Sequence, residues 1–288
     1  MSATASPPTA GAGRPPAPGP SAHPEGDSRT SLRSGLRHIG ALVRRNALQI
    51  KQDPESMMDV LLMPVIFTLL FVYVFGGAIG GGSGGDRDQY TNYLLPGMMA
   101  MMSINIAMAV GTGVNEDFRK GVMDRFRSMP ISRSSVLIAK VVVEIGRMLV
   151  AMAVLLTVGF LVGLDIQGHW AGLLASVGLA TVFGASLMWI FMLLGLSMNT
   201  AQGVQGVSFL VLMPLQFGSS IFVPTSTMPG WLETFTHVNP LTHVADAARG
   251  MMLGHGAVAG PALWTLVWSA ALTAVTAPVA IAKFRKKT

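Results

Sequence analysis

The chain has 288 residues, of which 51% are hydrophobic and only 12% are charged, and its formal net charge is +6. Apolar stretches of about 20 residues recur along it, which is the length a helix needs to cross a bilayer. This composition excludes an ordinary soluble domain and predicts an all-α membrane protein, because a lone helix satisfies its own backbone polar groups in lipid. The positive charge is typical of cytoplasmic loops and does not indicate nucleic-acid binding.

The first 52 residues divide into two parts. Residues 1–30 are rich in Pro, Ala, Gly and Ser and lack large apolar side chains, so we expect a disordered tail. Residues 31–52 place Leu32, Leu36, Ile39 and Val43 near one helical face between several arginines. This pattern predicts an amphipathic helix in the cytoplasmic membrane interface. An ordinary soluble amphipathic helix is the alternative.

Residues 53–288 are expected to form a transmembrane domain. Six apolar stretches predict six spans, at about 57–79, 93–114, 136–163, 171–196, 204–223 and 262–282.

The distribution of basic residues predicts the orientation of the spans. If the N-terminus is cytoplasmic, all but two of the 20 lysines and arginines lie on the cytoplasmic side, and the exceptions are Arg87 and Arg249. Cytoplasmic segments carry the excess of Lys and Arg in membrane proteins. We therefore expect a multi-pass plasma-membrane protein with both termini in the cytoplasm.

The segment between the second and third spans, residues 115–133, combines an apolar ridge with dense charge. Phe118, Val122 and Phe126 recur every four residues, acidic residues open the segment and basic residues close it, which suits the dipole of a short helix. Such a helix is suited to transmitting the movement of a soluble partner to the two adjoining spans. A solvated interfacial loop explains the pattern equally well. The residues of this candidate coupling helix are Glu116, Asp117, Phe118, Arg119, Val122, Asp124, Arg125 and Phe126.

Two sequence blocks carry a resemblance to a known family. They are GVMDRFRSMPISRSSVLIAK, at residues 121–140, and FVPTSTMPGWLETFTHVNPLTHVADAARGMM, at residues 222–252. With the opening span MDVLLMPVIFTLLFVYVFGGAI and the stretch YLLPGMMA, they resemble the ABC-2 type exporter permeases, closest to the daunorubicin/doxorubicin-resistance permeases. The resemblance extends from about Leu32 to the C-terminus.

The resemblance implies two copies of this permease, a homodimer, with two copies of a separate cytoplasmic ABC ATPase that binds ATP and Mg. It implies that the candidate coupling helix contacts this ATPase. It also implies extracellular helices between spans five and six that dip back into the membrane. The cargo would be a hydrophobic or amphipathic small molecule, drug-like or antibiotic-like, with lipid or polysaccharide as alternatives. The sequence agrees in one respect, because it contains no G-x-x-x-x-G-K-[ST] motif for phosphate binding.

Polar residues within the spans form two further candidate sets. Lys140, Glu144 and Arg147 share one face of the third span, as an ion network within that helix or as a contact with the coupling helix or the start of the substrate path. Polar groups and methionines in spans two and five serve either as packing and interhelical bonds or as a substrate path. The latter set is Met102, Ser103, Asn105, Ser208 and Gln216.

Other functional classes are less well supported. A secondary transporter driven by an ion gradient needs a carboxylate deep in a span, whereas Asp59, Glu144 and Asp165 lie near predicted span ends. The pattern of an intramembrane enzyme is missing, so we expect no catalytic residues in this chain. His237 and His243 lack a third ligand at useful spacing, so we expect no metal site.

Overall fold

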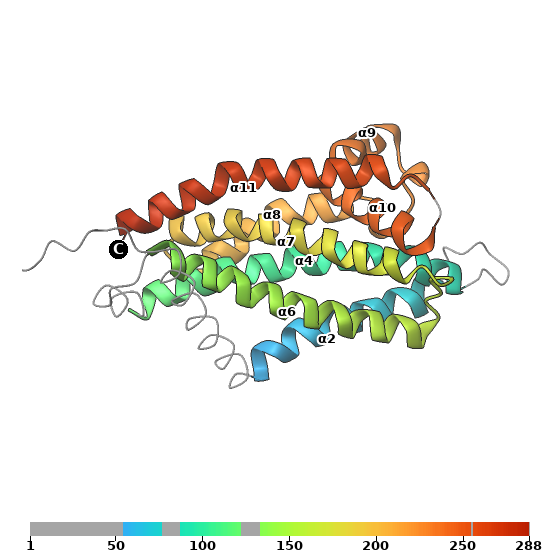
Figure 1. Ribbon diagram of the computed structural model, residues 1–288, viewed down its shortest axis with the longest axis horizontal. Coiled ribbons are helices and arrows are strands. Elements are labelled where there is room, and N and C mark those ends of the chain that lie inside the picture. The colour runs from blue at the N-terminus through green and yellow to red at the C-terminus, as the bar shows by residue number, and fades with distance from the viewer. Residues whose placement is uncertain (1–53, 77–86, 122–132, 255, 288) are drawn as a thin grey trace, which may run out of the picture.

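The computed structural model describes residues 54–76, 87–121, 133–254 and 256–287, and every structural statement below concerns these ranges. The predicted tail at 1–30 and the predicted interfacial helix at 31–52 lie outside them. Within the described ranges the protein is helical, with no strand. Long helices run side by side along an elongated bundle (Figure 1). They are α4 (Arg87–Arg119), α6 (Arg133–Val162), α7 (Trp170–Ser197) and α11 (Ala259–Lys287).

These four helices are long and apolar enough to cross a membrane. They correspond to the predicted second, third, fourth and sixth spans. The predicted first span corresponds to α2 (Pro54–Leu70), which a π-helix, η1 (Phe71–Phe75), continues, and the fifth to α8 (Ala201–Phe217). A 17-residue helix such as α8 is about 26 Å long, slightly less than the roughly 30 Å of bilayer hydrocarbon. A count of six spans therefore stays a prediction.

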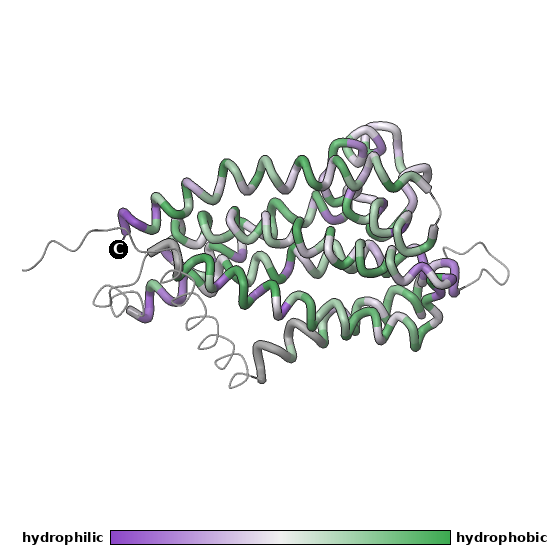
Figure 2. The backbone as a smooth tube through the Cα atoms, viewed as in Figure 1, coloured by the Kyte–Doolittle hydropathy of each residue, from purple (hydrophilic) through white to green (hydrophobic). Residues whose placement is uncertain are grey.

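The outer surface of the bundle is apolar where a membrane would surround it. Leu161, Leu174 and Leu210 are each more than two-thirds exposed, and many other large apolar side chains lie beside them on the surface. Hydrophobic residues fill the middle of the bundle, whereas hydrophilic residues gather toward its two ends (Figure 2). An exposed apolar surface of this extent is typical of a protein whose solvent is lipid.

The centre of the bundle is α4. In the most apolar stretch of α4, 78% of the residues are buried, whereas the corresponding share in α11 is 17%. Protein therefore surrounds α4, while α11 faces outward. The buried side chains of α4 include Leu94, Met98, Ile104 and Val110. A helix that is apolar on all sides belongs in the interior of a bundle.

Two glycines allow α4 and α7 to approach closely. A Cβ atom added to Gly195 would lie 2.2 Å from the carbonyl oxygen of Gly111, and one added to Gly111 would lie 2.5 Å from that of Phe191. No real Cβ fits at such distances. Small residues at such crossings let helix backbones pack at close range in membranes.

Short helices cover one end of the bundle (Figure 1). They are η2 (Thr225–Thr227), α9 (Gly230–Val238) and α10 (Pro240–Leu253). The turn-forming sequences Met228-Pro229-Gly230 and Asn239-Pro240 lie at the starts of α9 and α10. Asn239 caps α10 by accepting from Leu241 N at 3.0 Å. Its side-chain nitrogen donates to Leu215 and Gly218 carbonyls at 2.8 and 2.7 Å, so the same residue ties α10 to the end of α8.

We predict that Gly195→Ala destabilises the protein, whereas Gly178→Ala does not. The new methyl group at residue 195 meets backbone that cannot rotate away, which costs about 1–3 kcal/mol. A Cβ at Gly178, on the same helix, has nothing within 4 Å. The measurement is the thermal unfolding midpoint of each purified variant in detergent. Equal midpoints for the two variants would contradict the close crossing.

Candidate functional site

The first half of the predicted coupling helix is the last turn of α4. Glu116, Asp117, Phe118 and Arg119 continue the second span without a break, and the chain turns only at Gly121, whose φ of 68° is left-handed. The sequence placed the end of this span near residue 114 because hydropathy falls there, but a fall in hydropathy does not end a helix. The remaining candidates, Val122, Asp124, Arg125 and Phe126, lie outside the described residues.

The predicted set Lys140, Glu144 and Arg147, in the first half of α6, forms two separate ion pairs. Arg147 Nε lies 3.2 Å from Glu144 Oε2 within α6, and both side chains are nearly buried. Lys140 Nζ instead reaches across to Asp117 Oδ2 on α4, at 2.5 Å. Lys140 thus contacts a residue of the candidate coupling helix, whereas Glu144 and Arg147 pair within α6, and a functional role for the three residues stays a prediction. The Lys140–Asp117 pair is partly exposed and contributes under about 1 kcal/mol, so it orients α6 against α4 more than it stabilises the fold.

The end of α11 packs on the same turn of α4. The Phe118 ring contacts the Phe284 ring edge-on, with centroids 5.6 Å apart, and the Lys287 ammonium lies 5.6 Å from the centre of the Phe118 ring. Lys283 donates to Ser197 Oγ at 2.7 Å, which joins α11 to the end of α7. In the sequence, the basic end of α11 indicated only the orientation of the spans. The aromatic residue within KFRKK, residues 283–287, was the feature that pointed to a packing contact there.

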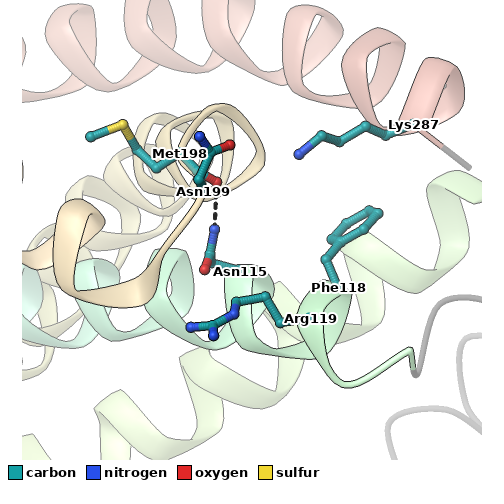
Figure 3. Close-up of a pocket in the computed structure, with 6 residues that line it drawn as sticks. All are labelled: Asn115, Phe118, Arg119, Met198, Asn199 and Lys287. Atoms are coloured by element: carbon teal, nitrogen blue, oxygen red, sulfur yellow. Dashed lines mark hydrogen bonds between the residues drawn. The ribbon is translucent and has the colours of Figure 1, made fainter.

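Asn115 fixes the turn between α7 and α8 against α4. Its side chain is 3% exposed, and its Nδ2 donates to the carbonyls of Gly195 and Met198 at 2.9 and 2.7 Å. A pocket of about 290 Å³ opens beside it, where the ends of α4, α7 and α11 meet. Figure 3 shows the residues that line this pocket, which are Asn115, Phe118, Arg119, Met198, Asn199 and Lys287.

The predicted substrate-path residues do not line this pocket. Met102 and Ser103 are fully buried in α4, and Ser103 donates to its own helix at Met99 O. Ser208 is buried in α8 and likewise donates to Val204 O. Asn105 and Gln216 are half-buried. The hydroxyls thus have local partners in this conformation, and a cargo-binding role for the five residues stays a prediction.

A buried arginine organises the opposite end of the bundle. Arg249 on α10 is 11% exposed and donates to Asp246 Oδ1 at 2.6 Å, to Tyr93 O at 2.9 Å and to Ser220 Oγ at 3.1 Å. It also donates to the Ser220 and Ile221 carbonyls, and its guanidinium lies 3.8 Å from the centre of the Tyr93 ring. The residue therefore joins α4, α10 and the loop after α8. The sequence singled it out only as a basic residue on the outer side.

His243, one of the two histidines at this end, contacts an aromatic side chain. The His243 ring stacks on Trp264, with centroids 6.1 Å apart. Burial lowers the pKa of His243, an effect that the nearby Asp246 carboxylate opposes. Among the described residues, no group of three or more His, Cys, Asp or Glu side chains is placed to hold a metal ion.

Together these features define a multi-pass helical membrane protein with a charged end, where α4 and α11 finish, and a tightly bonded opposite end. Residues 37–253 match the family model described as ABC-2 type transporter. The chain therefore belongs to the ABC-2 type transporter family and is a membrane permease, in agreement with the motif resemblance.

Named relatives are permeases as well. The chain is 35% identical to the daunorubicin resistance ABC transporter permease protein DrrB1 of Streptomyces coeruleorubidus, over 90% of this chain and 88% of that protein. It is 25% identical to the probable doxorubicin resistance ABC transporter permease protein DrrC of Mycobacterium tuberculosis, over 82% of this chain and 84% of the relative. The probable multidrug ABC transporter permease YbhR of Escherichia coli is also 25% identical, over 69% of this chain and 54% of its own length.

We predict that Arg249→Ala destabilises this end of the bundle by about 3 kcal/mol, because several partly buried acceptors lose a charged donor. Asp246→Asn should cost less, since its side chain is 40% exposed and the amide oxygen still accepts. Thermal unfolding in detergent and limited proteolysis of α9 and α10 measure both effects. A larger drop in the unfolding midpoint for Asp246→Asn than for Arg249→Ala would contradict the central role of the arginine.

Proposed function

We propose that this permease exports a hydrophobic or amphipathic drug-like compound, using ATP hydrolysed by a separate ATPase subunit. The observation that carries the proposal is the match to the daunorubicin resistance permease along 90% of the chain, which includes both ends of the bundle. Binding of ATP and Mg by the partner, and not by this chain, is part of the proposal. Export of a lipid or polysaccharide by the same architecture is the second candidate, because the ABC-2 family model names no cargo.

The geometry of α4 supports a mechanism for coupling. Its 33 residues form one continuous helix of about 50 Å, of which about 38 Å separates Tyr93, at the proposed outer end, from Phe118 in the last turn. A displacement applied to Glu116–Arg119 by an ATPase would be transmitted along a continuous helix to the Arg249 network. The predicted coupling helix would thus act through the second span directly, with no flexible joint between them.

Exposed apolar faces support the predicted homodimer. On α8, Phe209, Leu210 and Phe217 are each more than half exposed, and α2 and η1 carry further exposed apolar side chains, which include Met63 on α2 and Tyr73 on η1. A second copy of the permease would cover part of these faces, and lipid the remainder. The full assembly would then contain two permeases and two ATPases.

An ion-driven secondary transporter is less well supported. Among the described carboxylates in the spans, Asp117 is paired with Lys140 in the last turn of α4, and Glu144 is paired with Arg147 in the first half of α6. A carboxylate already paired with a basic side chain is poorly suited to binding and carrying an ion across the membrane.

We predict that Phe118→Ala reduces drug-stimulated ATPase activity and transport at least tenfold while the permease still inserts and folds. The substitution removes the ring that contacts both Phe284 and Lys287 at the proposed docking turn. The control is Phe160→Ala, an aromatic truncation near the other end of α6, against Trp170. The assay is ATP hydrolysis and drug uptake in inverted vesicles that contain permease and ATPase. Normal coupled transport in Phe118→Ala would count against the assignment of the coupling turn.

We also predict that the end of α11 is cytoplasmic and that α9 is external. The chain has no cysteine, so Lys286→Cys and Trp231→Cys each introduce a single labelling site at an exposed position. In intact cells a membrane-impermeant maleimide should label residue 231 and not residue 286, and permeabilisation should expose residue 286. The reverse pattern would overturn the orientation derived from the basic residues.

A further inference from the structure

The pocket where α4, α7 and α11 meet lies beside residues 116–119 of α4, which are called the coupling turn. The polar groups that line it are more than the contacts between these helices require. Among the described residues, its lining includes two cations, Arg119 and Lys287, and two amides, Asn115 and Asn199, but no carboxylate. Figure 3 shows Lys287 extending from α11 toward the amides, with Arg119 on the α4 wall. The nearest acids on α4 are already paired, Glu116 with Lys120 and Asp117 with Lys140. Positive charge in the pocket is therefore left for a ligand.

The position of the pocket along α11 indicates which ligand can reach it. Val279, Lys283 and Lys287 follow one another at four-residue spacing, so they lie along one side of the helix. Val279 is 48% exposed and belongs to the apolar outer face, whereas Lys287 lies about 12 Å further along. A lipid-facing helix side thus leads directly into the cationic pocket, at about the depth where bilayer hydrocarbon gives way to headgroups.

We propose that this pocket binds the phosphate group of an anionic phospholipid, with its acyl chains lying along the exposed side of α11. Arg119 and Lys287 supply the positive charge, and the Asn199 amide supplies a neutral hydrogen-bond donor. Basic pockets between transmembrane helices on the cytoplasmic side are suited to anionic headgroups. The lipid would join the end of α11 to the coupling turn of α4, next to the Phe118–Phe284 contact. This binding is independent of the cargo and of any ATPase.

The test uses the purified full-length chain in nanodiscs of phosphatidylcholine with increasing phosphatidylglycerol, and counts retained lipids by native mass spectrometry. We expect tight retention of phosphatidylglycerol by the wild type. Lys287→Gln should weaken retention about fivefold and the double variant Arg119→Gln, Lys287→Gln about 30-fold, since each basic residue contributes about one kcal/mol to anionic lipid binding. Lys286→Gln is the matched control, because it removes the same charge one residue away and does not line the pocket.

Several outcomes would overturn the proposal. An equal loss of phosphatidylglycerol retention in Lys286→Gln and Lys287→Gln would mean that the basic helix end attracts anionic lipid in general, without a specific site. Displacement of the lipid by millimolar inorganic phosphate would identify a soluble anion as the ligand. Unchanged lipid retention in the double variant, with loss of ATPase co-purification, would assign the pocket to an acidic side chain of the partner. Lys287 lies at an exposed helix end, so we expect the single variant Lys287→Gln to fold. Its lipid retention therefore tests the proposal even if the double variant does not fold.

Discussion

The glycine crossing between α4 and α7 is the constraint on which the rest of the structure depends. Gly111 and Gly195 allow the two backbones to approach, and Asn115 lies one turn beyond Gly111 on the same face of α4. At this separation the Asn115 amide reaches the carbonyls of Gly195 and Met198. The absence of a side chain at residue 195 thus permits both the crossing and the hydrogen bond that ends α7 beside α4. Met198 and Asn199, which line the pocket, take their positions from this bond.

The two ends of α4 are held in different ways. At the end next to α10, the nearly buried Arg249 bonds to several backbone and side-chain acceptors, so separation of α4 from α10 would leave a desolvated charge without partners. At the other end, Asp117 meets Lys140 in a partly exposed pair, and Phe118 rests against the last turn of α11. These contacts are individually weak in water-accessible surroundings. The proposed contact with an ATPase at this end would gain from side-chain contacts that rearrange at low cost in free energy.

Sequence patterns predicted the features that depend on local chemistry. Long apolar runs indicated membrane helices, and Pro229 and Asn239 marked the starts of α9 and α10. Patterns failed where a long-range contact decides the structure. The fifth span was expected to reach residue 223, but α8 ends at Phe217, and the following residues turn back to bind Arg249 and Tyr93. Arg249 and Tyr93 are 156 residues apart, and no local pattern relates them. The length of α4 was underestimated because hydropathy reports the environment of a helix and not its hydrogen bonding.

The filled interior of the permease limits where a cargo can travel. Ser103 and Met102 were candidates for a path because polar and flexible side chains in a span suit varied ligands. In the structure, a Cβ added to Gly184 would lie 2.5 Å from Met148 and 3.1 Å from Ser103, so α4, α6 and α7 are in close contact at this level. Drug-sized ligands need cavities of about 300–1,000 Å³. A route through the centre of one copy therefore requires α4 and α7 to separate and the Gly111–Gly195 crossing to break. A route along the exposed faces of α2 and α8 would leave that crossing and the Asn115 bonds intact.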